Sequence, residues 1–295
     1  MATKTAMITI AGRPNVGKST LTNYLVGEKI AIVSNKPQTT RNRICGIVTK
    51  NDTQFVFVDT PGYHKARTKL GDYMVNVTKN SIADVDLTIM MVEPIASIGP
   101  QEQGLIDQLK ASRCPVVLAI NKIDSVEKDT LLEVIAVYSK AADFAAIIPI
   151  SAKTGDGIES LLQICDKYAI ESPFLFPEDS TTDQPERQVM AEIIREKLLW
   201  TLEREVPHGT AVEITKFSER DNGIIDIDAT IYCEKASHKG IIIGKQGAML
   251  KKISSMARTD CEKFMGTRVY LTTWVKVKEN WRDSDFLVRN FGYRE

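Results

Sequence analysis

Short apolar runs alternate with amphipathic segments along the first part of the chain. Runs of Val, Ile and Leu flanked by turn residues predict strands at 7–11, 44–50, 54–59, 87–92, 116–121 and 146–150. Apolar residues spaced three and four apart predict helices that begin near Lys18, Lys69, Pro100, Lys128 and Gly157. Strands separated by helices form βαβ units, so we expect an α/β domain with a mostly parallel sheet.

The pattern changes after the proline-rich and polar stretch SPFLFPEDSTTDQPE at 172–186. We interpret this stretch as a linker whose Phe174, Leu175 and Phe176 are available to dock on a domain surface. Beyond it the sequence predicts a helix at 186–204, a hairpin of strands at 211–217 and 224–234, a helix at 248–265 and a strand at 268–277. With a helix leading into the segment GIIIGKQG, the order is α-β-β-α-α-β, which predicts a second, α+β domain.

Length and composition agree with two soluble domains. The chain has 295 residues, of which 43% are hydrophobic and 26% charged. The formal net charge is zero, so any basic surface must be local. The five cysteines are scattered singly, which argues against a zinc site or a disulfide framework and favours free thiols in a reducing cytoplasm. We identify no signal peptide and no apolar stretch of about 18 residues that would span a membrane.

The segment GRPNVGKS at 12–19 fits the phosphate-binding pattern G-x-x-x-x-G-K-S, between a predicted strand and a predicted helix. Gly12 and Gly17 let the backbone curl so that successive N–H groups converge on phosphate oxygens, and the helix N-terminus adds a favourable dipole. Lys18 would reach the β- and γ-phosphates, and the Ser19 hydroxyl would ligate Mg²⁺. A plain glycine turn would not require the lysine–serine pair.

Two further segments complete a predicted triphosphate site. Asp59 ends an apolar strand and begins the segment DTPG, so its carboxylate is placed to hold Mg²⁺ through water while the amide of Gly62 reaches the γ-phosphate. The segment PQTTR at 37–41 would bring a threonine to Mg²⁺ and the γ-phosphate when GTP is bound. We favour Thr40 over Thr39, and a polar surface loop is the alternative interpretation.

The segment NKID at 121–124 follows another apolar strand and predicts a guanine site. The Asp124 carboxylate can accept both N1–H and the 2-amino group of guanine, a pattern that adenine lacks. Asn121 would tie this loop to the phosphate loop, and the stem of Lys122 would cover the base. The segment SAK at 151–153 would add a backbone N–H to guanine O6.

A glycine loop and a basic segment predict RNA binding in the second half. Gly244-Lys245-Gln246-Gly247 fits the GxxG loop of a KH domain, which clamps the backbone of about four nucleotides. Between residues 235 and 268 there are eight basic and two acidic residues, leaving a net charge of +6 in a chain whose total is zero. Such a face binds phosphates in a salt-dependent way; a solvated helix face is the alternative. The expected RNA contacts are Lys239, Gly244, Lys245, Gln246, Gly247, Lys251 and Lys252.

These motifs resemble those of the TRAFAC-class GTPases and, along nearly the whole chain, those of the Era family of bacterial ribosome-assembly GTPases. The phrases GRPNVGKSTL, QTTRNRI, DTPGYHK, NKID, SAKTG, REVPH and IIGKQGAMLKKI occur here in that family's order. The resemblance implies an Era-type G domain followed by a type II KH domain, with GTP, GDP and Mg²⁺ as ligands. It also implies binding of 16S rRNA near its 3′ end during maturation of the 30S ribosomal subunit.

The predicted boundaries are 4–172 for the G domain, 173–185 for the linker, 186–280 for the KH domain and 281–295 for a C-terminal extension. The expected GTP contacts are Gly12, Arg13, Pro14, Asn15, Val16, Gly17, Lys18, Ser19, Thr20, Asp59, Thr60, Pro61, Gly62, Asn121, Lys122, Asp124, Ser151, Ala152 and Lys153. Among these and Thr40, we assign the catalytic roles to Lys18, Thr40 and Gly62, and the Mg²⁺ site to Ser19, Thr40 and Asp59.

The hydrolytic machinery departs from that of many GTPases. Tyr63 stands where many of them place a water-orienting glutamine after the DxxG glycine, and Pro14 replaces a phosphate-loop glycine. We therefore predict slow intrinsic hydrolysis that depends on positioning, Lys18 and Mg²⁺. Asn15 supports a further hypothesis, K⁺ bound at the phosphate loop. Arg41 and Arg43 are interpreted as solvated surface arginines, and a contribution of positive charge from this loop to the site is the alternative.

The remaining expectations concern the aromatic residues of the second half, the location of the protein and the alternative functions. Trp274 is expected in the core. The aromatic residues of the C-terminal extension are expected to pack on the KH surface, with stacking on RNA as the alternative: Trp281, Phe286, Phe291 and Tyr293. We expect a monomeric cytoplasmic protein, with peripheral membrane association as an additional location. The alternatives to a GTP-hydrolysing switch are an RNA-binding module that GTP only gates, and a membrane-associated signalling GTPase. A tRNA-modifying GTPase is disfavoured because no second catalytic domain is present.

Overall fold

The computed structural model describes residues 2–62, 68–83, 85–112 and 114–293. The chain divides into two compact units. The first comprises Met1–Ala31, Thr40–Ala66 and Met74–Asp183, and the second comprises Ile32–Thr39, Arg67–Tyr73 and Gln184–Glu295. Each unit has its own sheet and its own apolar core.

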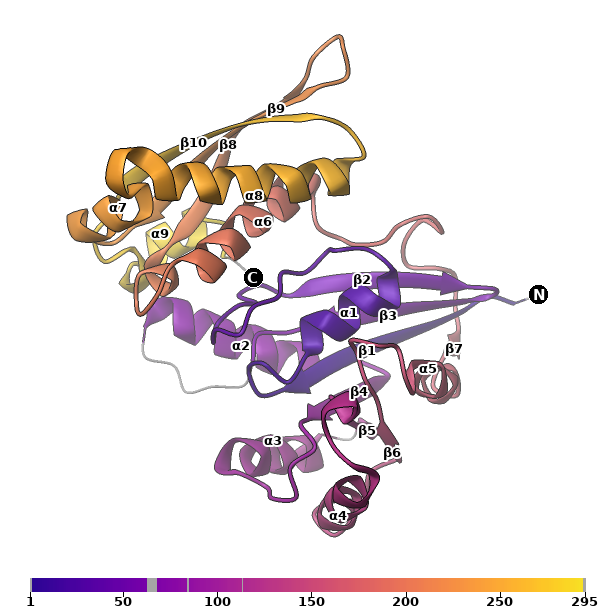
Figure 1. The fold of residues 1–295 in the computed structure, drawn as a ribbon. Coiled ribbons are helices and arrows are strands. Elements are labelled where there is room, and N and C mark those ends of the chain that lie inside the picture. Colours follow the sequence, from indigo (N-terminus) through magenta and orange to yellow (C-terminus); the bar gives the residue numbers. More distant parts are fainter. Residues whose placement is uncertain (1, 63–67, 84, 113, 294–295) are drawn as a thin grey trace. The chain divides into compact units, whose positions relative to one another are not determined.

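The first unit is built on a sheet with strand order β2-β3-β1-β4-β5-β6, and β7 pairs with β1 (Figure 1). Strands β1, β3, β4, β5 and β6 run parallel, whereas β2 and β7 are antiparallel to their neighbours. The predicted mostly parallel sheet is therefore confirmed. The strands are β1 (Lys4–Gly12), β2 (Ile44–Lys50), β3 (Thr53–Asp59), β4 (Leu87–Val92), β5 (Val116–Ile120), β6 (Ala146–Pro149) and β7 (Ile170–Glu171).

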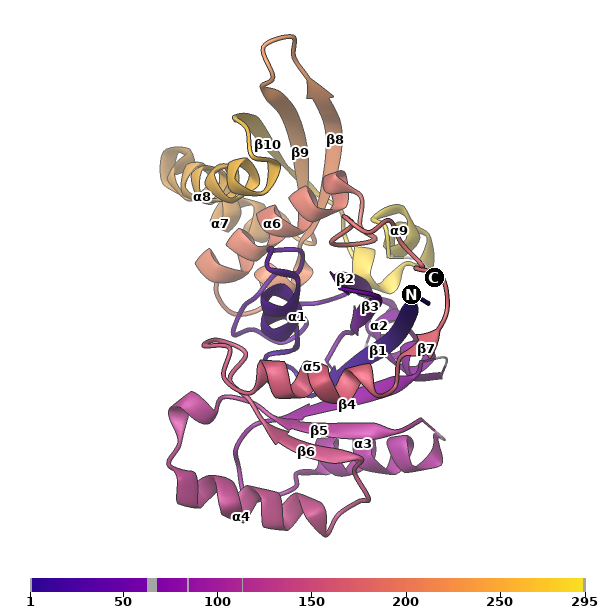
Figure 2. The same ribbon diagram turned by 90° about the vertical axis from the view of Figure 1, so that its right-hand side faces the viewer.

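Helices cover both faces of this sheet, as the near-continuous apolar strands require. Leu21 of α1 and Leu161 of α5 share one apolar cluster with Ile8 and Ile10 of β1. Residues of α3 and α4 share another cluster with Met90 and Val92 of β4. Figure 2 shows α5 running along the sheet in front of β4. The helices are α1 (Lys18–Val26), α2 (Lys69–Ala83), α3 (Pro100–Ala111), the short η1 (Ile123–Ser125), α4 (Lys128–Ser139) and α5 (Ile158–Asp166).

The second unit has the predicted order α-β-β-α-α-β. Its elements are α6 (Glu186–Thr201), η2 (Pro207–Gly209), β8 (Ala211–Glu219), β9 (Ile225–Cys233), α7 (Ala236–Ile243), η3 (Lys245–Gly247), α8 (Ala248–Met265) and β10 (Val269–Val277). The sheet order is β10-β9-β8, with β10 parallel to β9 and β8 antiparallel to it. Ile193 of α6 and Ile253 and Ala257 of α8 pack on the sheet in one core, so Ile253 is a core residue.

The segment Ile32–Thr39 belongs to the second unit because it is held on α6. The N–H of Val33 donates to Oε1 of Glu196 at 2.9 Å, and Nε1 of Trp200 donates to the carbonyl of Val33 at 2.8 Å. Arg195 also donates to the carbonyl of Thr39. Thr39 immediately precedes the predicted site residue Thr40, so the conformation of this segment bears on that residue.

The C-terminal extension folds as η4 (Trp281–Asp283) and α9 (Asp285–Asn290). Trp281 is fully buried, and its Nε1 donates to the carbonyl of Gly209 at 2.9 Å. Its ring meets those of Phe291 and Tyr293, which confirms the packing interpretation for these three residues. The same expectation is wrong for Phe286, which lies on the outer side of α9 and is 70% exposed.

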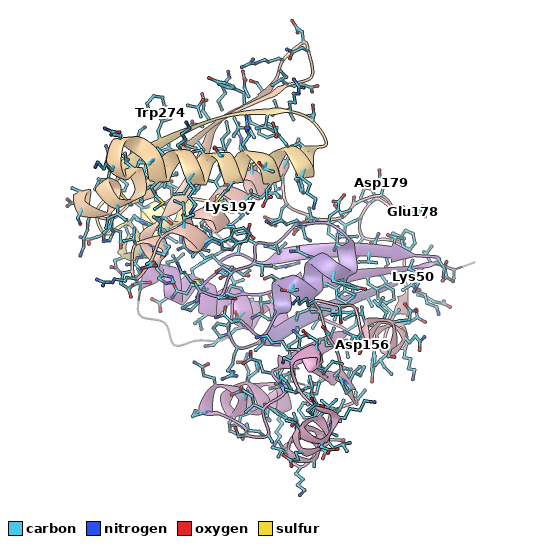
Figure 3. The ribbon with its side chains drawn as sticks, viewed as in Figure 1. Lys50, Asp156, Glu178, Asp179, Lys197 and Trp274 are labelled. Carbon is cyan, nitrogen blue, oxygen red and sulfur yellow. The ribbon has the colours of Figure 1, made fainter. Side chains whose placement is uncertain are left out.

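The expectation that Trp274 lies in the core is also wrong, because its side chain is 60% exposed (Figure 3). Alternate residues of a strand point to opposite faces of the sheet. Val269 and Val275 point into the core, so the intervening even-numbered positions, among them Tyr270 and Trp274, point away from it. The apolar run predicted the strand correctly but not which of its two faces each aromatic residue would take.

The linker is tied to the first unit by Gln54 of β3. Its Oε1 accepts from the N–H groups of Leu175 and Phe176, and its Nε2 donates to the carbonyl of Phe176 at 3.0 Å. The ring of Phe176 packs against Cys45 and neighbouring residues. The backbone of Leu175 and Phe176 and the ring of Phe176 thus dock as predicted, whereas the Leu175 side chain is 52% exposed.

All five cysteines are free thiols, and four are buried while Cys114 is half-buried. Within the described part of the chain, no helix is both long and apolar enough to span a bilayer.

Candidate nucleotide and RNA sites

The phosphate loop joins β1 to α1 and is closed over the amine of Lys18. Nζ of Lys18 donates to the carbonyls of Gly12 and Arg13, at 3.2 and 3.1 Å. The side chain is almost fully buried, and this burial lowers the pKa of Lys18 while the nearby Asp59 carboxylate opposes the shift. Gly17 has a φ of 103°, and a Cβ there would lie 2.3 Å from Nδ2 of Asn121. Only glycine fits this position, so the sequence pattern has a steric reason.

Three oxygen-bearing side chains converge beside Lys18. Oγ of Ser19 donates to Oδ2 of Asp59 at 2.6 Å and lies 2.9 Å from Oγ1 of Thr40. Asp59 is fully buried, and desolvation raises its pKa to about 6 although the Lys18 charge and the Ser19 hydrogen bond lower it. Its Oδ1 is buried without a hydrogen-bond partner among the described residues. Hydroxyl and carboxylate oxygens with an unsatisfied buried lone pair fit a hard divalent cation such as Mg²⁺.

The structure places Thr40, and not Thr39, in this cluster. The Thr39 hydroxyl bonds instead to Ser34 at 2.7 Å and to the carbonyl of Lys36 at 2.6 Å. Arg41 is 1% exposed, so its interpretation as a solvated arginine is wrong, whereas Arg43 is exposed as expected.

Gly62 lies against the phosphate loop, where a Cβ would stand 2.7 Å from the backbone nitrogen of Pro14. Thr60 is buried, and its hydroxyl donates to the carbonyl of Ile10 at 3.0 Å. This hydrogen bond links the segment after β3 to β1. Tyr63 lies outside the described residues.

The base-recognition segments follow β5 and β6. Nδ2 of Asn121 donates to the carbonyl of Val16 at 2.7 Å, and its Oδ1 accepts from the N–H of Ala152 at 2.9 Å. This one side chain therefore ties the phosphate loop, the NKID loop and the SAK loop together. Oγ of Ser151 donates to Oδ1 of Asp124 at 2.7 Å, which orients the carboxylate. Lys153 is exposed and Thr20 is half-buried.

An ion-pair cluster at the same edge was not foreseen from the sequence. Arg13 pairs with Glu93 at 3.2 Å and with Glu102 at 2.6 Å, and Lys122 pairs with the other oxygen of Glu93. Glu93 follows β4 and Glu102 lies in the first turn of α3, outside every recognised motif. Glu93 follows β4, which lies between β1 and β5, the strands that precede the phosphate loop and the NKID segment. That position was the only sequence signal for these ion pairs.

The KH loop joins α7 to α8. Gly244 has a φ of 72°, and a Cβ there would lie 2.7 Å from Cβ of Met249, so this turn requires glycine. Lys245 and Gln246 are exposed at the tip, Lys251 and Lys252 are exposed in the first turns of α8, and Lys239 is half-buried. Met249 packs on the core, so it supports the loop from inside. The geometry presents backbone and lysine side chains to solvent, as phosphate binding needs.

Two family models match the chain. One, described as "50S ribosome-binding GTPase", matches residues 7–122, and the other, described as a KH domain, matches residues 205–282. "GTPase Era" of Ruminiclostridium cellulolyticum is 54% identical over 294 residues, which cover 100% of this chain and 99% of that protein. The chain belongs to the Era family of GTPases. "GTPase Era" of Clostridium kluyveri is 52% identical over 291 residues, covering 99% of both chains.

Two solved Era structures match the whole fold with a TM-score of 0.94 and 37% identity, covering 99% of this chain and 100% of theirs. One is an Era bound to MgGDPNP and to nucleotides 1506–1542 of 16S ribosomal RNA. The other is a variant of Aquifex aeolicus Era bound to GDP and AlF₄⁻. This chain thus shares with these Era proteins both the G-domain fold and the KH fold.

Proposed function

We propose that this Era-family protein is a GTP-hydrolysing switch that binds 16S rRNA near its 3′ end and assists maturation of the 30S ribosomal subunit. The observation that carries the proposal is that a phosphate and metal site and a guanine site form in a chain that also presents a KH loop. The phosphate and metal site consists of Lys18, Ser19, Thr40 and Asp59, and the guanine site of Asn121 and Asp124. An Era relative has been solved with MgGDPNP and a 16S rRNA fragment, which supports both ligands here.

In this proposal the phosphate loop, residues 12–20, wraps the α- and β-phosphates with its N–H groups, and Lys18 neutralises the β- and γ-phosphates. Lys18 already bonds two carbonyls of the loop, so its amine is preorganised close to the bound phosphates. The Asp124 carboxylate would accept hydrogen bonds from the guanine edge while Ser151 orients it. Asn121 connects the phosphate loop, the NKID loop and the SAK loop through its two hydrogen bonds. The N–H of Gly62 would meet the γ-phosphate, and a backbone N–H of the SAK segment at 151–153 would meet guanine O6.

Ser19, Thr40 and Asp59 would hold Mg²⁺, with Asp59 acting through water. The unpartnered Oδ1 of Asp59 and the two adjacent hydroxyls fit this ion. When bound, Mg²⁺ neutralises charge on the β- and γ-phosphate oxygens. A tyrosine, and not a glutamine, follows Gly62, so the usual water-orienting side chain is missing from this position. Catalysis would then depend mainly on the positioning of the phosphates. We therefore expect slow intrinsic turnover.

A K⁺ ion near Asn15 is a separate part of the proposal. Asn15 lies in the phosphate loop with a φ of 66°, a backbone conformation in which asparagine is favoured. A monovalent cation there would supply positive charge next to the transferred phosphoryl group, as an arginine finger does. Turnover in KCl above that in NaCl at equal ionic strength supports this part, and equal rates refute it.

The KH unit would clamp single-stranded RNA at Gly244–Gly247, with Lys239, Lys245, Lys251 and Lys252 around the phosphates. We keep the boundaries 4–172, 173–185, 186–280 and 281–295 as part of the proposal, supported by the start of α6 at Glu186. We also propose a monomer that works in the cytoplasm. Peripheral membrane association is a further prediction, which flotation of purified protein with phospholipid vesicles tests.

Crosslinking to total bacterial RNA, with sequencing of the bound fragments, tests the proposal directly. The protein is loaded with GDP in one arm and with GDPNP in the other. A footprint at the 3′ end of 16S rRNA that is stronger with GDPNP is expected. Fragments spread evenly over all RNA, or a protein that does not prefer GTP to ATP, would contradict the proposed function.

A further inference from the structure

One carboxylate, that of Glu93, joins the two loops that hold opposite ends of the nucleotide. Its Oε2 lies 3.2 Å from a terminal guanidinium nitrogen of Arg13, the second residue of the phosphate loop. Its Oε1 pairs with Nζ of Lys122, the second residue of the NKID loop. Each carboxylate oxygen therefore pairs with a side chain of a different loop.

The fold explains how one residue can reach both loops. In the sheet β4 lies between β1 and β5, which end in the phosphate loop and in the NKID loop. Met91 pairs with Gly12, and Val92 pairs with Ile120, so Glu93 is the first residue after β4 and lies just beyond both pairings. The N–H of Asn121 still donates to the carbonyl of Val92 at 2.9 Å, which fixes the backbone just before Glu93.

A residue of α3, Glu102, also pairs with Arg13. Nε of Arg13 lies 2.6 Å from Oε1 of Glu102, and the Glu102 side chain is only 6% exposed. Arg13 is thus held by two carboxylates from different elements, while Glu93 also holds Lys122. The side chains of Arg13, Glu93 and Lys122 are 29%, 27% and 40% exposed, so these pairs are screened less than fully exposed ones. A connected network also fixes each side chain at a lower entropic cost than an isolated pair does.

We infer that Glu93 is a positioning residue that sets how long a guanine nucleotide stays bound. It acts through Lys122, whose aliphatic stem covers the base, and through Arg13, whose backbone forms part of the phosphate cradle. This inference rests on the proposed function, because it assigns a role within the same nucleotide site. Glu93 contacts the loops and not the γ-phosphate, so it stabilises GDP and GTP complexes alike.

The test is the dissociation rate of a fluorescent GDP, mant-GDP, chased with excess GDP from the full-length protein. Each half-buried ion pair contributes about as much as the stronger surface pairs, so loss of two pairs in Glu93→Gln should accelerate dissociation about fivefold to tenfold. The change should appear in KM for GTP and not in kcat. Raising NaCl from 50 mM to 1 M should shrink the difference from the wild type.

The matched control is Glu159→Gln, which removes an exposed ion pair with Lys50 at 3.0 Å in the same unit and should leave dissociation unchanged. Glu93→Asp keeps the charge on a shorter arm and should give an intermediate rate. Combining Glu93→Gln with Lys122→Met should give less acceleration than the product of the two single effects, because both remove the same pair.

The outcomes separate the two proposals. A wild type that retains mant-GDP while Glu93→Gln releases it at the wild-type rate overturns the role of Glu93 alone. Strictly multiplicative effects of Glu93→Gln and Lys122→Met also overturn it, because Glu93 would then not act through Lys122. A wild type that fails to retain mant-GDP overturns both this inference and the proposed function. Matching thermal unfolding curves for Glu93→Gln and wild type exclude misfolding as the cause of faster release.

Discussion

The hydroxyl of Ser19 donates a 2.6 Å hydrogen bond to Oδ2 of Asp59, and this pair joins the first turn of α1 to the end of β3. Oγ1 of Thr40 lies 2.9 Å from the same hydroxyl, so the three oxygens form one cluster, and its carboxylate, that of Asp59, interacts electrostatically with Lys18. Burial disfavours the charge on Asp59, and its second oxygen has no partner in the described part of the chain. A divalent cation bound beside Asp59 would favour the ionised carboxylate and satisfy that oxygen.

Ser19→Ala should therefore weaken Mg²⁺-dependent nucleotide binding. Loss of a partner that only orients a metal ligand costs about 10–100-fold in metal affinity or activity, and loss of a direct ligand should cost at least that. We expect the Mg²⁺ concentration for half-maximal GTP turnover to rise by about 100-fold or more. Ser139→Ala, at an exposed position of α4, is the control. An unchanged Mg²⁺ dependence of Ser19→Ala would remove this residue from the metal site.

Asp124→Asn should change the base preference of the protein from guanine to xanthine. The carboxylate accepts two donors from guanine, whereas an asparagine amide offers one acceptor and one donor. Xanthine carries a carbonyl where guanine carries its 2-amino group, so the amide complements xanthine instead. We expect GTP affinity to fall by about 10²-fold or more, and XTP to compete better than GTP against mant-GDP. The Ser151 hydroxyl can still donate to the asparagine oxygen, so the loop should keep its shape.

The sequence predicted those features that depend on local pattern. The alternation of apolar runs located β1 to β6 of the first unit, and residues 44–50 and 87–92 coincide with β2 and β4, whereas the short β7 was not predicted. Glycine positions were predictive because their reasons are steric: Gly17 and Gly244 leave no room for a Cβ. A motif read in order along parallel strands also implies spatial convergence, since the carboxyl ends of those strands meet at one edge of the sheet.

Features that depend on tertiary context could not be predicted. Arg41 is buried and Trp274 is exposed, although residue type favours the opposite in both cases. The Glu93 pairs join residues 29 and 80 positions apart in sequence, and no short motif records such a contact. The docking of Ile32–Thr39 on α6 likewise depends on residues more than 150 positions away along the chain.

Lys245→Ala should lower RNA affinity in a way that reveals a phosphate contact. One lysine–phosphate contact changes the slope of log affinity against log salt by about one. We expect that change for a short single-stranded RNA from the 16S 3′ end, with binding weakened about equally for unrelated sequences. Gly244 and Gly247 are retained, so the turn should keep its conformation. Lys140→Ala, an exposed lysine at the end of α4, should leave the slope unaltered, and equal slopes for all three proteins would contradict the phosphate contact.

Lys197→Met should destabilise the second unit more than any exposed charge replacement. The Lys197 side chain, labelled in Figure 3, is 2% exposed. Its Nζ pairs with the carboxylates of Glu196 in α6 and Asp260 in α8. Its Nζ also stands 3.7 Å from the centroid of the Trp200 ring. Removing one member of a buried ion pair leaves an uncompensated charge and costs about 3–5 kcal/mol. The fully buried Glu196 carboxylate would lose the positive charge of Lys197 and keep the hydrogen bond from the Val33 N–H.

Urea unfolding followed by tryptophan fluorescence measures this loss selectively. The three tryptophans of the chain, Trp200, Trp274 and Trp281, all lie in the second unit, so the signal is blind to unfolding of the first. Lys216→Met, which breaks an ion pair whose lysine is 51% exposed, is the matched control and should cost less than about 1 kcal/mol. The double variant Glu196→Gln/Lys197→Met should recover part of the loss, because it no longer buries the negative charge that Lys197 balances in the wild type. Equal midpoints for Lys197→Met and Lys216→Met would show that the buried charges do not hold α6 to α8.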